Sequence, residues 1–127
     1  MDIEEVKHKL DGIAFYRIML DDLPGKRQQL LTMLCRNLDG CSTPPCSDEY
    51  NLAVKEFKDM EKTYRQEIAA RMQIIKSPCL TEKEQEVLSL RYDRCMPWCE
   101  IMEKMYYSHE NLMRIAKKAY LKLGKAL

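Results

Sequence analysis

The first 78 residues carry apolar side chains at helical spacing. Near the start, one apolar face recurs every three or four positions: Ile3, Val6, Leu10 and Ile13. A second apolar stripe follows before residue 40: Leu30, Leu31, Leu34 and Leu38. Residues 21–25 interrupt the two stripes, and Pro24 within them predicts the first turn of a new helix or a kink.

A longer helix is predicted from Ser47 or Asp48 to Lys76, after a proline-rich loop at residues 41–46 that reverses the chain. Its apolar residues step by three or four throughout: Val54, Phe57, Met60, Tyr64, Ile68, Met72 and Ile75. The other faces are heavily charged, so this helix cannot bury its stripe alone. We therefore expect residues 1–78 to form an antiparallel, coiled-coil-like hairpin that associates further, most simply as a homodimer.

Residues 79–127 predict three shorter helices with capping signals. Thr81 and Glu84 have the spacing of a capping box, in which the threonine accepts from the Glu84 amide and the glutamate reaches back. Pro97 suits the first position of the second helix, and Ser108 is a good N-cap for the third. The first and third helices have these expected buried residues: Val87, Leu88, Leu90, Tyr92, Leu112, Ile115, Ala119 and Leu123. The expected fold is all-α, with the hairpin 1–78 followed by a compact domain 79–127.

The last twenty residues carry an excess of positive charge. The formal net charge of the 127 residues is +1, but residues 108–127 hold five lysines and arginines against Glu110 alone. A basic terminal helix is the electrostatic footprint of an element that contacts phosphates, although a basic stripe can also be an ordinary solvated face.

Membrane insertion, secretion and catalysis find no support in the sequence. Apolar runs are short and interrupted by charges, and the first residues lack the basic and apolar segments of a secretory signal. We therefore expect a cytoplasmic protein. There is no glycine-rich phosphate loop or nucleophile elbow, and His8 and His109 are isolated. We expect neither an enzyme nor a cofactor.

The six cysteines do not predict a metal centre or a disulfide frame. Without a secretion signal, disulfides are not expected. Cys41 and Cys46 are separated by four residues, and Cys95 and Cys99 by three, whereas two intervening residues would be a stronger signal for zinc. Neither histidine stands at ligand spacing from a cysteine. We expect reduced thiols and no metal site.

The last 48 residues resemble a known family. Residues 80–92, LTEKEQEVLSLRY, are similar to the first helix of sigma-70 region 4-like domains, and residues 98–102, WCEIM, to their positioning helix. Residues 108–123 resemble their recognition helix. With a helical hairpin in front, the whole chain resembles phage and prophage transcriptional regulators of the ArpU/RinA type. The resemblance implies a helix-turn-helix domain that binds double-stranded promoter DNA.

Four positions depart from the family pattern. Tyr106 stands where the turn usually has glycine, and Met102 where a small alanine is common. Met113 occupies a base-facing position often held by a long polar residue, and His109 replaces a common arginine. The turn and the base contacts are therefore the features that the structure must explain.

The predicted recognition helix supplies the candidate DNA-binding residues: Ser108, His109, Glu110, Met113, Arg114, Lys117, Lys118 and Lys122. Arginine pairs with guanine edges, so Arg114 is the candidate for base reading, and the lysines are candidates for phosphates. Glu110 could accept from a cytosine amino group or complement the positive helix N-terminus. Ser108 and His109 could donate to phosphate, or serve as an N-cap and a solvated side chain.

Two other functions fit the same pattern. A helix-turn-helix can grip a protein such as RNA polymerase, which would make the chain an interaction adaptor. The small subunit of a phage terminase also joins a helix-turn-helix to oligomerising helices. Salt-dependent binding of random duplex distinguishes a DNA binder from an adaptor, and a ring-sized oligomer would favour the terminase.

Overall fold

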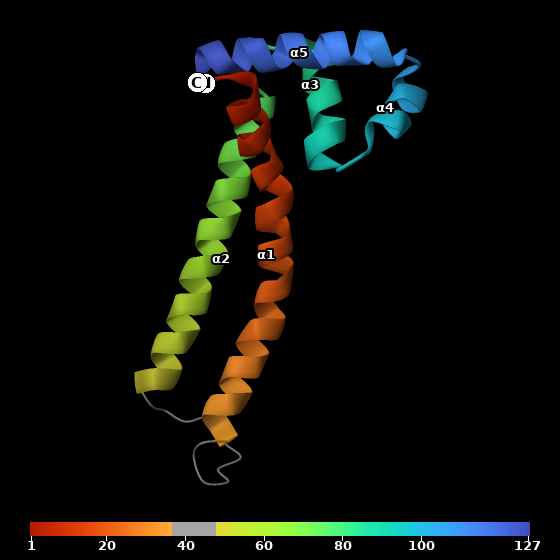
Figure 1. Ribbon diagram of the computed structural model, residues 1–127. Helices are drawn as coiled ribbons and strands as arrows, with labels where there is room; N and C mark the ends of the chain where they lie inside the picture. The colour runs from red at the N-terminus through yellow and green to blue at the C-terminus, as the bar shows by residue number, and fades with distance from the viewer. Residues whose placement is uncertain (37–47) are drawn as a thin grey trace. The chain divides into compact units, whose positions relative to one another are not determined.

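A computed structural model describes residues 1–36 and 48–127, and the described chain is all-α (Figure 1). The helices are α1 (Ile3–Arg36), α2 (Asp48–Ile75), α3 (Glu82–Leu88), the π-helix η1 (Ser89–Asp93), α4 (Trp98–Met105) and α5 (His109–Ala126). The long helices α1 and α2 pack as an antiparallel hairpin, as the sequence predicts. Within residues 1–36 and 48–127, no helix is both long and apolar enough to cross a membrane.

Some expectations fall on residues that are not described. Leu38, Cys41, Cys46 and Ser47 lie outside the described residues, as do the side chains of Leu34 and Cys35. The expected loop at 41–46 is therefore not tested.

The expected interruption at residues 21–25 is wrong as a helix boundary, because α1 is a single helix with Pro24 inside it. Proline fixes a φ that a helix accepts, and its main cost is the hydrogen bond that its missing N–H would donate to the carbonyl of Leu20. Leu23, beside the proline, is only 5% exposed. Burial of such neighbours offsets the lost bond and keeps the helix continuous.

The described residues divide into two compact units. The core unit comprises Met1–Phe15 and Glu67–Leu127, and the hairpin unit comprises Tyr16–Gln66. The start of α1 and the end of α2 therefore belong to the same compact unit as α3, α4 and α5. The expected division into a hairpin, 1–78, and a helix-turn-helix domain, 79–127, stays a prediction.

The core unit contains two apolar clusters. The first joins both ends of the chain and both long helices: Val6, Leu10, Ile13, Ile75, Leu80, Leu88, Tyr92, Ala116, Ala119, Tyr120 and Leu123. The second lies around α4: Val87, Leu90, Ile101 and Leu112. Trp98 packs against both clusters. The N-terminal amino group also donates to the carbonyl oxygen of Gly124 at 3.1 Å, so the start of the chain is held against α5.

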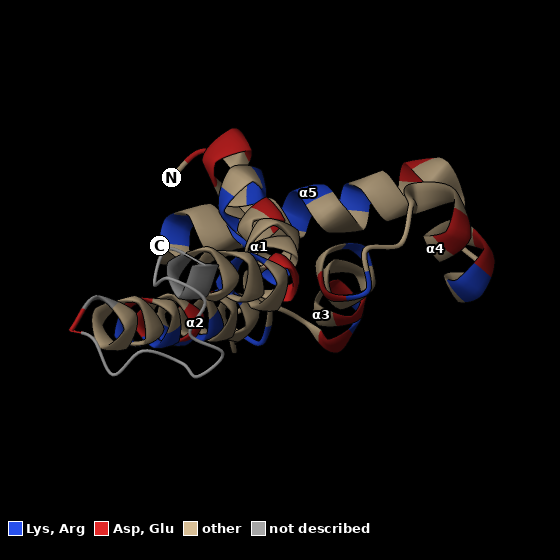
Figure 2. Ribbon diagram, turned by 90° about the horizontal axis from the view of Figure 1, so that it is seen from below, with Lys and Arg blue, Asp and Glu red and all other residues tan. Residues whose placement is uncertain are grey.

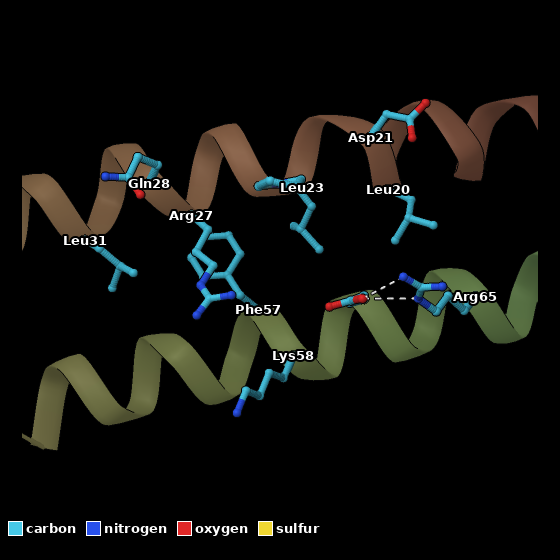
Figure 3. A pocket seen from close by; sticks show the side chains of 11 residues that line it. Leu20, Asp21, Leu23, Arg27, Gln28, Leu31, Phe57, Lys58 and Arg65 are labelled. Atoms are coloured by element: carbon cyan, nitrogen blue, oxygen red, sulfur yellow. Dashed lines mark hydrogen bonds and ion pairs between the residues drawn. The ribbon is translucent and has the colours of Figure 1, made fainter.

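The hairpin unit is packed less tightly. Leu20, Leu23 and Leu31 of α1 point toward Phe57 of α2 (Figure 3). A cavity of about 540 Å³ separates the two helices there, with charged side chains from both at its rim. Only two apolar residues of this unit's described part are buried, Leu23 and Ala53.

Candidate nucleic-acid interface

The α3 helix begins with half of the expected capping box. The Thr81 hydroxyl accepts from the Glu84 amide at 3.3 Å, which confirms Thr81 as the N-cap. The Glu84 side chain does not complete the box, because one of its oxygens accepts from Lys122 Nζ at 2.7 Å. Glu84 is 5% exposed, and a buried carboxylate needs a cationic partner more than it needs a cap. This ion pair ties α3 to α5.

A left-handed residue makes the turn between α4 and α5. Tyr106 has φ 57° and ψ 37°, a conformation that glycine adopts at least cost. The amide of Tyr107 donates to the carbonyl oxygen of Met102 at 3.2 Å, which closes the end of α4. The tyrosine ring is 93% exposed, so it obstructs nothing in its own chain. The turn therefore keeps the geometry of a glycine turn with tyrosine in that place.

The α5 helix begins where the sequence predicts, because the Ser108 hydroxyl accepts from the Asn111 amide at 3.2 Å. Of the expected apolar face, Leu112, Ala119 and Leu123 are buried and Ile115 is half-buried. The buried face also includes Ala116 and Tyr120, which are not among the predicted buried residues. They follow Leu112 by four and eight residues, and this helical spacing could have predicted that they share its face.

Tyr120 is buried because it meets Tyr92 inside the core unit. The two hydroxyls lie 2.6 Å apart, and the rings meet edge to face with centroids 6.4 Å apart. Burial raises the pKa of Tyr92, and the hydrogen bond with Tyr120 raises it further. Burial also raises the pKa of Tyr120. The pair is a neutral hydrogen-bonded link between η1 and α5.

The opposite side of α5 carries the positive charge. Six of the eight candidate DNA-binding residues are exposed: Ser108, His109, Glu110, Arg114, Lys117 and Lys118. The first two stand at the N-terminus of α5, and the other four lie on the side away from the buried residues. Arg114 and Lys118 stand four residues apart and therefore lie on one side of the helix. Lys125, also exposed, continues this side. Figure 2 shows the resulting basic bands along α5.

The other two candidates have roles inside the chain. The ammonium group of Lys122 neutralises the buried Glu84 carboxylate, and its side chain is 40% exposed. Met113 is half-buried and packs against the second apolar cluster. Neither residue offers the open surface of Arg114 or Lys118.

A groove runs along one edge of this surface. It has a volume of about 480 Å³ and is lined in part by Met113 and Lys117 of α5 and by Glu4 and Asp11 of α1. Lys7 and Arg91 also line the groove, so its cationic side chains outnumber the two carboxylates. Arg114 and Lys118 do not line the groove and are exposed.

Arg91 and Trp98 are engaged within the core unit. The Arg91 guanidinium lies 4.8 Å from the centroid of the Trp98 ring and donates to the carbonyl oxygen of Met96 at 3.2 Å. Such stacking orients an arginine and covers an aromatic face. The pair fixes the segment that leads into α4, which is a positioning role.

The described thiols are exposed and reduced: Cys79, Cys95 and Cys99. Within residues 1–36 and 48–127, no group of three or more histidine, cysteine, aspartate or glutamate side chains could hold a metal ion. Searches found no family model, no curated protein and no solved structure that matches the chain.

Proposed function

We propose that this chain is a DNA-binding transcriptional regulator of the phage and prophage type, and that residues 108–126 enter the major groove as a recognition helix. In this proposal, α3 with η1, α4 and α5 form a sigma-70 region 4-like helix-turn-helix domain. The protein acts as a homo-oligomer, most simply a dimer. The observation that carries the proposal is the exposed basic side of α5, presented next to a tight turn from α4.

The roles follow from the placement of each side chain. Arg114 is exposed on the second turn of α5, where a guanidinium can pair with the two acceptors of a guanine edge. Lys118 lies one turn further and serves a phosphate. Ser108 and His109 are exposed at the helix N-terminus, where the free N–H groups also favour a phosphate. Glu110 would accept from a cytosine amino group.

The internal contacts support this arrangement by holding α5 still. The Lys122–Glu84 ion pair anchors α5 to α3, and the Tyr92–Tyr120 hydrogen bond anchors it to η1. We therefore propose that Lys122 positions α5 and does not contact a phosphate. A rigid recognition helix lowers the entropy lost on binding.

The test begins with duplexes selected from random DNA and measures affinity at several salt concentrations. Arg114→Ala should weaken binding to the selected site by about 1–3 kcal/mol and relax its base preference. Lys118→Ala should instead weaken all duplexes alike and reduce the salt slope by about one unit. Lys117→Ala should behave like Lys118→Ala, because Lys117 is also an exposed lysine of α5.

Lys62→Ala is the matched control, since it removes the same charge from an exposed position of α2 in the hairpin unit. It should leave affinity and salt slope almost unchanged. If the native protein binds no duplex at low salt, or if Arg114→Ala changes neither affinity nor preference, the recognition helix does not enter the groove. An adaptor that binds RNA polymerase would then be the better proposal.

A further inference from the structure

One side of α1 in the hairpin unit carries an ordered row of four exposed residues: Ile18, Asp22, Lys26 and Leu30. Residues four apart are neighbours on a helix surface and form a ridge. The apolar ends of this ridge are exposed to different degrees, Ile18 at 61% and Leu30 at 36%. The order along the ridge is apolar, acidic, basic, apolar.

This order is complementary to itself when two copies of α1 run antiparallel. The midpoint of the row is Pro24, so a two-fold axis there places Ile18 opposite Leu30 of the second copy. The same axis places Asp22 opposite Lys26 of the second copy, and the reverse pair forms as well. We propose that the chain forms a symmetric dimer in which the α1 rows of two copies pack antiparallel about an axis near Pro24.

The charges on the row argue for a second copy as the occupant. A two-fold interface brings the same patch of both subunits together, so the patch must complement itself. A parallel pairing in register would set Asp22 against Asp22 and Lys26 against Lys26, which is repulsive. The antiparallel pairing is the one that joins opposite charges and also covers both apolar ends.

Space for the second copy is available on this side of α1. Leu20, Leu23 and Leu31 point toward α2 (Figure 3), whereas Ile18 and Asp22 lie on another side of the helix. Leu30, seven residues after Leu23, lies at the edge of the side that faces α2. At Gly25, next to Lys26, an added β-carbon would meet no atom within 4 Å. Met33, one turn beyond the row, is 59% exposed and extends its apolar end.

The apolar stripe of α2, which the sequence also suggests as an association surface, is less exposed than this row. Phe57 and Ile68 of that stripe are already half-buried. In the proposed dimer the apolar ends provide the affinity, and the two Asp22–Lys26 pairs set the direction and register. This inference deepens the oligomeric part of the proposed regulator, but it requires no DNA.

Sedimentation equilibrium of the full chain without DNA tests the dimer. The native protein should dimerise, and Asp22→Lys alone should raise the dimer dissociation constant by about tenfold or more, because like charges then meet at two symmetric positions. Lys26→Asp should do the same. The double reversal, Asp22→Lys with Lys26→Asp, should restore the native dissociation constant within about threefold, since the pairs re-form with opposite sense.

Lys62→Asp is the matched control, as it reverses an exposed charge of α2 outside the row. It should leave the dissociation constant unchanged. Circular dichroism should show equal helicity in all variants, because every altered side chain is exposed. A native protein that remains monomeric at high concentration overturns the proposal, and so does a double reversal that fails to restore the dimer. Neither result would bear on DNA binding, which is measured separately.

Discussion

The core unit and the hairpin unit are built from the same two long helices, yet they use them differently. In the core unit, Val6, Leu10 and Ile13 of α1 are fully buried against segments from the other end of the chain. In the hairpin unit the described apolar residues are mostly exposed or half-buried, and Leu23 and Ala53 are the exceptions. A pair of helices has too little surface to bury its stripes, whereas additional helices supply the missing partners.

This difference implies that the free energy of folding is concentrated in the core unit. Leu88→Ala should lower the free energy of unfolding by about 2–5 kcal/mol, because Leu88 is fully buried and the smaller side chain leaves a cavity. Leu31→Ala in the hairpin unit should cost less than about 2 kcal/mol, since Leu31 is only half-buried. Urea denaturation followed by circular dichroism measures both. Equal costs would contradict the comparison.

The buried tyrosine pair gives a second, smaller contrast. Tyr92→Phe removes one hydroxyl and leaves that of Tyr120 buried without its partner, which should cost about 1–3 kcal/mol. Tyr64→Phe is the matched control in the hairpin unit, where Tyr64 is half-buried and its ring lies 5.9 Å from that of Tyr16. The control should change stability much less. The same denaturation experiment compares the two, and a neutral Tyr92→Phe would show that the pair adds nothing.

The same pair makes stability depend on alkaline pH. Burial raises the pKa of both Tyr92 and Tyr120, so the folded protein holds these protons more tightly than the unfolded chain. The stabilisation is therefore complete below the unfolded pKa of about 10 and is lost as the pH rises above it. Denaturation at a series of pH values should show this decline, and Tyr92→Phe should make it shallower. An unchanged slope in that variant would contradict the assignment.

The smallest expected effect concerns backbone conformation. Tyr106→Gly should raise the free energy of unfolding by up to about 1 kcal/mol, because glycine relieves the left-handed strain but loses more entropy on folding. Tyr106→Ala keeps the β-carbon and is the control that should give no such gain. In the hairpin unit glycine is the unfavourable residue, so Gly25→Ala should stabilise α1 by about 0.5–1 kcal/mol. Thermal unfolding at low protein concentration measures all three, and a loss of stability in Tyr106→Gly would contradict the strain argument.

Much of the candidate site follows from local sequence signals. Thr81 and Ser108 cap the helices that they were predicted to cap, and α2 ends within one residue of its predicted end. The exposed position of Arg114 and Lys118 follows from the same periodicity that predicts the buried face of α5. These features depend on residues within one or two turns of each other, so a single sequence contains the information.

The tertiary structure decided which surface each helix face meets. The sequence predicts that Glu84 completes a capping box, yet its carboxylate pairs with Lys122, 38 positions away. It also predicts a new helix or a kink at Pro24, and the structure has one helix that continues through the proline. Helical periodicity shows which residues share a face, but the partner of that face is set by contacts between distant segments, whose energies no local pattern records.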